Sequence, residues 1–242
     1  LGRILLALMA ALTLGLWLAP VMVLALVSLL TIGTLVATTV LKALAFRATL
    51  RGLRQPEAAH PDAGMEEKWP VISVMVPLFR ESDVAGKLVG RLSRLDYPRE
   101  LTDILLVIEA SDQVTQKALQ GVRLPGWIRV VEVPNGPVQT KPRALNYALN
   151  FCRGAIIGVW DAEDRPDPDQ LHKVARRFHF APADVACLQG ALDYYNPRTN
   201  WLARCFTIEY AAWFRVILPG VARLGLVVPL GGTTLFFRRD AL

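Results

Sequence analysis

Charged residues are missing from the beginning of the chain. No Asp, Glu, Lys or Arg lies between Arg3 and Lys42, although charged residues make up 20% of the 242-residue sequence. The hydrophobic fraction of 53% exceeds what a soluble domain of this length needs, and the excess lies in this stretch. About 38 residues in one helix would measure roughly 57 Å, nearly twice the ~30 Å of a hydrocarbon core. One straight membrane crossing is therefore disfavoured.

Two helices folded as a hairpin fit this stretch better than one. Because Pro20 interrupts it near the middle, we predict a transmembrane segment over residues 1–50, with helices at about 4–19 and 21–43. A cleaved signal peptide is the alternative, although its apolar core would span only about 7 to 15 residues.

Basic residues flank the apolar stretch on both sides. Arg3 precedes it, and Lys42, Arg47, Arg51 and Arg54 follow it. Since positively charged flanks stay on the cytosolic side, a hairpin would leave both of its ends in the cytosol. We therefore expect a multi-pass protein of the inner (plasma) membrane that contacts membrane lipid and whose remaining domain is cytosolic.

Cysteine is scarce, and the sequence signatures of dehydrogenases and of nucleic-acid-binding proteins are absent. The three cysteines form no CxxC pair, which suits free thiols in a reducing compartment. No G-x-G-x-x-G follows any predicted strand, which argues against a dehydrogenase. The net charge of +6 does not indicate nucleic acid, because the basic residues are not interleaved with aromatics as in single-strand binders.

The rest of the chain alternates between apolar β-branched runs and helical patterns. Residues 51–68 are rich in Pro, Ala and acids and are predicted to be a linker, and a domain begins at Trp69 and continues to the end of the sequence at 242. Strands are predicted at 71–76, 104–108, 128–133, 155–160 and 186–191, and helices at 83–95, 115–122, 141–151 and 168–180. This order predicts an α/β domain with a mostly parallel sheet covered by helices on both faces.

Acidic residues gather where the predicted strands end, which is where such sheets bind ligands. Asp161, Glu163 and Asp164 follow one strand within four residues and would repel one another without a cation among them. Oxygen ligands without nearby His or Cys favour Mg²⁺ or Mn²⁺, which complete their shells with substrate phosphates. A solvated turn ahead of a helix is the alternative. A helix that opens with Lys141 and Arg143 lies just before this strand, and its N-terminus suits a phosphate group.

Five motifs occur in the order seen in one enzyme family. They are V-P-L-F-R-E at 76–81, L-D-Y-P at 95–98, K-P-R-A-L-N-Y-A-L at 141–149, W-D-A-E-D-R-P-D-P-D-Q-L at 160–171 and P-L-G-G-T-T at 229–234. Residues 69–242 thereby resemble the family 2 glycosyltransferases, and most closely their bacterial cellulose-synthase-like branch with an N-terminal membrane hairpin. The resemblance implies a GT-A fold, Rossmann-like, and inverting transfer of a sugar from a nucleotide-diphospho-sugar, typically a UDP-sugar, to a saccharide or lipid acceptor, as in polysaccharide synthesis.

The resemblance also implies roles for single residues. Donor binding is implied for Pro77, Glu81, Glu109, Asp112, Lys141, Arg143 and Asp161, and acceptor-side contact for Gly231, Gly232 and Thr233. The metal ligands implied are Asp161 and Glu163, with Asp164 as an alternative. The chain departs from the family pattern at Glu163, where Asp is usual, and at Ala110, where many members have a second Asp.

The acid that serves as general base in this family follows the Gly-Gly-Thr loop in a T-E-D or E-D motif, and none occurs before Leu242. We therefore expect a piece of a longer enzyme whose base lies beyond this residue. Two alternatives stay open: a nucleotidyltransferase, which normally has a glycine-rich phosphate loop, and a catalytically inert nucleotide-binding membrane scaffold. The aromatic stretch 200–218 is interpreted as a core helix, with an interfacial membrane helix as the alternative.

Overall fold

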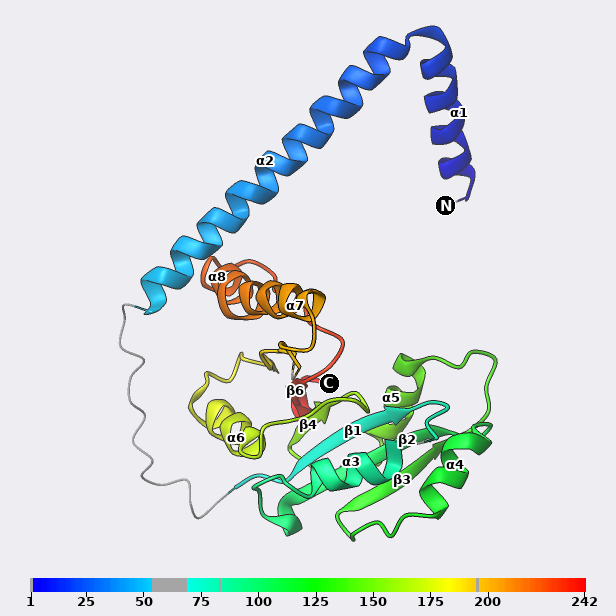
Figure 1. Ribbon diagram of the computed structural model, residues 1–242, viewed down its shortest axis with the longest axis vertical. Helices are drawn as coiled ribbons and strands as arrows, with labels where there is room; N and C mark the ends of the chain where they lie inside the picture. The colour runs from blue at the N-terminus through cyan, green and yellow to red at the C-terminus, as the bar shows by residue number, and fades with distance from the viewer. Residues whose placement is uncertain (1, 54–68, 83, 195) are drawn as a thin grey trace. The chain divides into compact units, whose positions relative to one another are not determined.

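The computed structural model describes residues 2–53, 69–82, 84–194 and 196–242 (Figure 1). The chain divides into two compact units. Within the described residues, the first unit contains residues 2–53 and 212–228, and we call it the anchor unit. The second contains residues 69–211 and 229–242, and we call it the sheet unit. Residues 54–68, which form most of the predicted linker, lie outside the described residues.

The anchor unit is built on two apolar helices, α1 (Gly2–Leu18) and α2 (Pro20–Leu53), which meet at a sharp turn and diverge from it as an inverted V (Figure 1). The break lies at Ala19, because the following proline has no N–H to continue the first helix. α2 ends ten residues later than the predicted 43, since no Pro or Gly interrupts residues 42–51. Five threonine hydroxyls on these helices donate to carbonyls one turn earlier, so their polar groups are satisfied within the helix.

Two helical stretches within the described residues are long and apolar enough to cross a membrane. They are α2, with a mean hydropathy of 2.4, and Trp201–Arg223, with a mean hydropathy of 1.2. Core helices and signal sequences meet the same criterion, so the membrane crossing stays a prediction.

The sheet unit contains a six-stranded sheet with the order β3-β2-β1-β4-β6-β5. The strands are β1 (Ile72–Leu78), β2 (Thr102–Glu109), β3 (Ile128–Val133), β4 (Ile156–Val159), β5 (Cys187–Gln189) and β6 (Leu235–Arg238). β1, β2, β3 and β4 pair in parallel, whereas β6 is antiparallel to both of its neighbours. The predicted α/β class with a mostly parallel sheet is confirmed. The short strand β6 was missing from the prediction.

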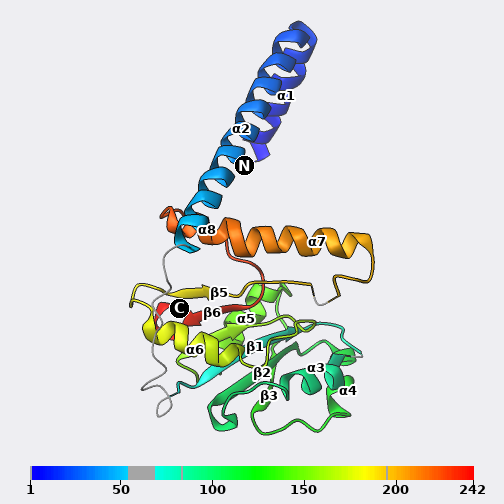
Figure 2. The same cartoon turned by 60° about the vertical axis from the view of Figure 1, so that its left-hand side comes forward.

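Helices cover both faces of this sheet (Figures 1 and 2). They are α3 (Val84–Leu92), α4 (Gln113–Gln120), α5 (Lys141–Leu149) and α6 (Gln170–Phe180). Alternate residues of each central strand face opposite cores: Val74 packs in the cluster with residues of α3, α4 and α6, and Met75 packs in the cluster with α5. Burial on both faces explains why these strands read as continuous apolar runs.

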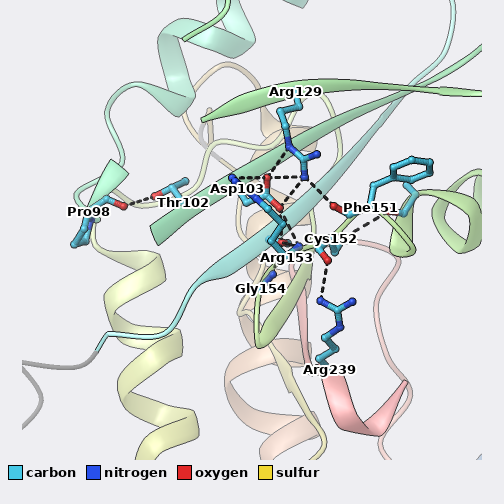
Figure 3. Close-up of polar contacts among 11 residues, drawn as sticks. Pro98, Thr102, Asp103, Arg129, Phe151, Cys152, Arg153, Gly154 and Arg239 are labelled. Carbon is cyan, nitrogen blue, oxygen red and sulfur yellow. Dashed lines mark hydrogen bonds and ion pairs between the residues drawn. The ribbon is translucent and has the colours of Figure 1, made fainter. Parts of the chain in front are cut away.

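A buried carboxylate ties the strands together at the amino end of the sheet (Figure 3). Asp103 of β2 is fully buried and accepts hydrogen bonds from the Ser73 hydroxyl at 2.7 Å and from Arg129 Nε at 2.9 Å. Arg153 Nη2 also donates to it, at 3.2 Å. Burial alone would raise the pKa of Asp103, but these hydrogen bonds hold it below its usual value. This cluster lies at the end of the sheet opposite the acidic strand ends and stabilises the fold.

α7 (Trp201–Ala212) corrects one expectation. The aromatic stretch is helical, but α7 buries only Ala203, and Trp201 is 74% exposed. The core interpretation is therefore wrong for this helix. Its aromatic residues pack locally instead: Phe206 stacks on Tyr194 with ring centroids 5.5 Å apart.

Candidate active site

The carboxyl ends of β1, β2 and β4 open onto a cavity of about 450 Å³ in the sheet unit. Its lining combines apolar residues with polar residues at three strand ends and at the start of α5. The lining residues are Pro77, Leu78, Phe79, Glu81, Val107, Glu109, Gln139, Thr140, Lys141, Ala144, Asp161, Ala162 and Glu163. Six residues expected at the site from the sequence therefore meet in one cavity: Pro77, Glu81, Glu109, Lys141, Asp161 and Glu163.

A strained turn follows β1 on one side of this cavity. Arg80 has a φ of 56°, in the left-handed region that non-glycine residues rarely adopt. Its N–H donates to Asp112 Oδ2 at 2.6 Å, and the next N–H, of Glu81, donates to Thr115 Oγ1 at 2.9 Å. These two hydrogen bonds hold the backbone of the turn and so fix the position of the Glu81 Cα atom.

Asp112 supports this turn from behind and does not line the cavity. Its carboxylate caps α4, accepting from the Thr115 N–H at 3.1 Å and from the Thr115 hydroxyl at 2.6 Å. Burial alone would raise the pKa of Asp112, but hydrogen bonds from Thr115 and from the Arg80 N–H lower it. Both carboxylate oxygens are thus committed to the protein itself.

Glu109 and Arg143 form an ion pair at the end of β2. The Glu109 side chain is 7% exposed, and its Oε2 lies 3.2 Å from Arg143 Nη1. Arg143 also donates through Nη2 to the carbonyl of Pro134. The guanidinium is therefore occupied in orienting Glu109 and the loop that follows β3.

The acidic loop after β4 is held from several directions. Arg91 of α3 donates to the carbonyls of Ala162, Glu163 and Asp164, at 2.9, 2.6 and 3.0 Å. Asp164 Oδ2 accepts from the Asp161 N–H at 2.8 Å. These hydrogen bonds to Arg91 and Asp164 hold the backbone of the loop. The side chains of Asp161 and Glu163 are not used for this purpose, and both residues line the cavity.

Thr233 joins the acidic loop to the glycine-containing loop. Its hydroxyl donates to Asp164 Oδ2 and accepts from the Asp161 N–H at 2.9 Å. Lys141 makes a second link, because Nζ contacts both Asp161 Oδ1 and the carbonyl of Gly232, the latter at 3.0 Å. Burial raises the pKa of Asp164, and its acidic neighbours act in the same direction.

Gln189, at the end of β5, holds the glycine-containing loop from the other side. Its Oε1 accepts from the Gly231 N–H at 2.7 Å, and its Nε2 donates to the Thr233 carbonyl at 3.1 Å. Thr234 has a φ of 54°, so this loop also contains a residue in the left-handed region. Residues 231–233 are thus adjacent to the cavity lining, through Lys141, and are not part of it.

The residues present fit a divalent cation that shares its ligands with a substrate. No group of three or more His, Cys, Asp or Glu within the described ranges is arranged to hold a metal alone. Asp161 and Glu163 supply two carboxylates at the cavity, while Asp164 is turned toward Thr233. Mg²⁺ and Mn²⁺ often bind through one or two carboxylates plus phosphate oxygens. This donor set suits that arrangement better than a preformed cage.

Sequence reasoning missed the supporting residues around this cavity. Phe79, Gln139 and Thr140 line it, and Arg91 and Gln189 brace its loops. The Asp-x-x-Thr spacing at 112–115 is an N-cap signal that would have indicated a structural use for this Asp. The bracing contacts of Arg91 and Gln189 have no comparable local signal.

The sheet order, the cavity at its carboxyl edge and the acidic loop define a protein of the GT-A fold. This fold is shared with the mannosyltransferase PcManGT from Pyrobaculum calidifontis, solved in complex with GDP-Man and Mn²⁺. The two structures superpose with a TM-score of 0.60 at 21% sequence identity, covering 86% of this chain and 55% of that one.

Sequence comparison then gives the family. Residues 70–242 match the family described as "Glycosyltransferase like family 2", and the chain belongs to it. It is 31% identical over 196 residues to a beta-monoglucosyldiacylglycerol synthase of Synechocystis sp., covering 75% of this chain and 40% of that protein. A synthase of the same name from Trichormus variabilis is 27% identical over 190 residues, covering 76% and 39%. The chain thus spans about 40% of the length of these relatives.

Proposed function

We propose that this chain is the donor-binding part of a membrane-anchored, inverting glycosyltransferase. The donor is a nucleotide-diphospho-sugar, with UDP as its nucleotide, and it occupies the 450 Å³ cavity. One observation carries the proposal: carboxylates from three strand ends and the amine of Lys141 converge on one cavity at the carboxyl edge of the sheet. Nucleotides bind at this edge in open α/β sheets.

The residues divide between direct contact and positioning. Pro77, Glu81 and Glu109 are assigned to the base and ribose, and Lys141 to the diphosphate. Asp161 and Glu163 would hold Mg²⁺ or Mn²⁺ together with phosphate oxygens. The cation, when bound, stabilises charge on the leaving diphosphate.

Asp112, Arg143 and Asp164 are positioning residues in this proposal. Each is committed to protein partners, respectively the Arg80 turn, Glu109 and Thr233. We infer that Asp164 orients the acidic loop and is not itself a metal ligand.

A lipid is the acceptor in this proposal. The two relatives at 31% and 27% identity are both named as glucosyldiacylglycerol synthases, which implies sugar transfer to a hydroxyl of a membrane lipid. The apolar hairpin supports the same choice, because it would hold the site near such an acceptor. Residues 231–233 are assigned to the acceptor side. The general base is assigned to an acid further along the whole protein.

Calorimetry on the full chain in nanodiscs tests the donor site. We expect UDP to bind more tightly than GDP, and only in the presence of Mn²⁺. Asp161→Asn removes a charged ligand and should weaken this binding by at least about tenfold, since charge-assisted contacts to a cation are lost. The matched control is Asp184→Asn, which changes an exposed acid outside the cavity. Equal UDP binding with and without metal, or in both variants, would contradict the metal assignment.

Sugar transfer needs a separate assay. The whole protein, incubated with a UDP-sugar and diacylglycerol, should release UDP and form a glycolipid. Donor binding without any transfer by the whole protein would favour the inert scaffold. A polymeric saccharide product would replace the lipid acceptor and leave the donor site as assigned.

A further inference from the structure

All of the chain's net positive charge lies in the anchor unit. Of the 27 Lys and Arg and 21 Asp and Glu residues, six basic residues and no acidic one fall within residues 2–53 and 212–228. The remaining residues, with residues 54–68 counted among them, contain equal numbers of both signs. The basic residues of the anchor unit are Arg3, Lys42, Arg47, Arg51, Arg215 and Arg223. Two of them lie in residues 212–228, outside the predicted hairpin.

Residues 212–228 pack against the end of α2 that carries the basic residues. They contain a short π-helix (Trp213–Ile217) and α8 (Leu218–Arg223). The Thr49 hydroxyl, on a residue only 4% exposed, donates to the Val216 carbonyl at 2.6 Å. Ala45 is fully buried, and a Cβ added at Gly220 would overlap its carbonyl group. This close approach fixes the π-helix and α8 at one level of α2.

That level corresponds to the lipid headgroups if α2 crosses the membrane. The first charged residue of α2 is Lys42, and Ala45 lies three residues later, about 4.5 Å further along the helix axis. The headgroup layer is roughly 5 to 8 Å thick on each side of the hydrocarbon core. The Gly220 contact therefore falls within that layer.

The segment that follows α8 exposes apolar side chains directly after Arg223 in the sequence. Val227 is 93% exposed, Leu226 48% and Leu224 40%. Gly225, with a φ of 71°, allows the sharp turn that presents them. Exposed apolar residues close in sequence to arginines suit the boundary between headgroups and acyl chains, and a segment that contains arginines and no acid suits anionic lipid.

We propose that residues 212–228 form a second membrane contact, which lies in the headgroup layer and binds anionic phospholipid through Arg215 and Arg223. Leu226 and Val227 enter the acyl boundary. This inference rests on the membrane anchoring in the proposed function, and it does not depend on the identity of the donor or the acceptor.

Depth-dependent fluorescence quenching in nanodiscs tests it. The full chain, with its three native cysteines replaced (Cys152→Ala, Cys187→Ser, Cys205→Ser), receives one fluorophore at Val227→Cys. Nitroxide lipids carry the quencher either near the glycerol backbone or near the end of the acyl chain. We expect the shallow quencher to act more strongly than the deep one. The effect should be larger in discs containing phosphatidylglycerol than in phosphatidylcholine alone, and Arg215→Gln with Arg223→Gln should remove that difference.

Two further labels make the outcomes distinguishable. A label at Leu35→Cys, on the middle of α2, should respond to the deep quencher, and one at Val130→Cys, exposed on β3, should respond to neither. If the label at position 35 were quenched and the label at 227 were not, the second contact would be overturned and the anchoring left intact. The same conclusion would follow if the labels at 227 and 130 were quenched equally. Absence of quenching at 35 would overturn both. Sugar transfer by the whole protein, assayed separately, tests the proposed reaction.

Discussion

Single side chains decide which acids of the site can meet a cation. Asp161 and Glu163 face the cavity, whereas the Oδ2 atom of Asp164 is bound to Thr233 and to the Asp161 N–H. An amide oxygen can accept the same hydrogen bonds as a carboxylate. The conservative substitution therefore separates a metal ligand from a positioning residue.

We predict that Asp164→Asn retains Mn²⁺-dependent UDP binding to within a few-fold, while Asp164→Ala loses about 10–100-fold, as is typical when a group behind a metal ligand is removed. Glu163→Gln and Asp161→Asn should both lose binding, because an amide does not replace the charge. Titration calorimetry of the four variants measures this. If Asp164→Asn lost as much binding as Asp161→Asn, Asp164 would be a ligand.

The strained turn at Arg80 gives a second prediction. Asp112→Ala removes a helix cap worth about 1 kcal/mol and releases the Arg80 N–H. We expect lower thermal stability and weaker UDP binding. Glycine adopts a φ of 56° without the penalty of roughly 1–2 kcal/mol that other residues incur, so adding Arg80→Gly should recover part of the loss.

A double-mutant cycle measures this coupling. Strictly additive effects of Asp112→Ala and Arg80→Gly would show that the carboxylate does not hold the turn.

At the scale of helices and strands, the contact between α2 and α8 gives a prediction whose sign is informative. In an unhindered helix Gly→Ala stabilises by up to about 1 kcal/mol. At Gly220 the new Cβ would overlap the Ala45 carbonyl, so Gly220→Ala should instead destabilise the contact by about 1–3 kcal/mol.

Hydrogen exchange measures that effect locally. Backbone amides of 213–224 should exchange faster in Gly220→Ala, with those of the sheet unchanged. Gly33→Ala is the matched control, because nothing lies within 4 Å of its added Cβ. Slower exchange in Gly220→Ala would mean that the close contact with α2 does not form.

Most helices and strands were predictable because each leaves a local pattern. The central strands are buried on both faces and give unbroken apolar runs, and α5 begins at Lys141 as expected. β6 has only four residues directly after a glycine-rich loop, so no alternation could develop. The roles of side chains were less predictable. Arg80 meets Asp112 across 32 residues and Asp164 meets Thr233 across 69, and no local pattern encodes such pairs.

Stability against acid is a property of the whole sheet unit, and Asp103 contributes to it. Its pKa is lowered in the folded protein, so its contribution is complete above the unfolded pKa of about 3.9 and is lost as the pH falls through the folded value. Asp103→Asn leaves buried donors poorly paired and should cost about 1–3 kcal/mol at neutral pH. Between pH 5 and about 2, the free energy of unfolding of this variant should also fall less than that of the unmodified chain, because the variant has no carboxylate at 103 to protonate.

Denaturant unfolding at several pH values checks this, with Asp184→Asn as the control because it alters an exposed acid. Parallel pH profiles for Asp103→Asn and the unmodified chain would contradict the assigned role of the carboxylate.

The uneven charge distribution also bears on how the donor arrives. A nucleotide-sugar carries two negative charges, and many proteins accelerate the capture of such ligands with a strong positive field. Here the residues outside the anchor unit, with residues 54–68 counted among them, contain equal numbers of acidic and basic residues, so together they exert little long-range attraction on the donor. In the proposed function, recognition would then begin at the contact between Lys141 and the diphosphate. The rate of donor encounter should accordingly be set by diffusion and orientation, and should change little with ionic strength.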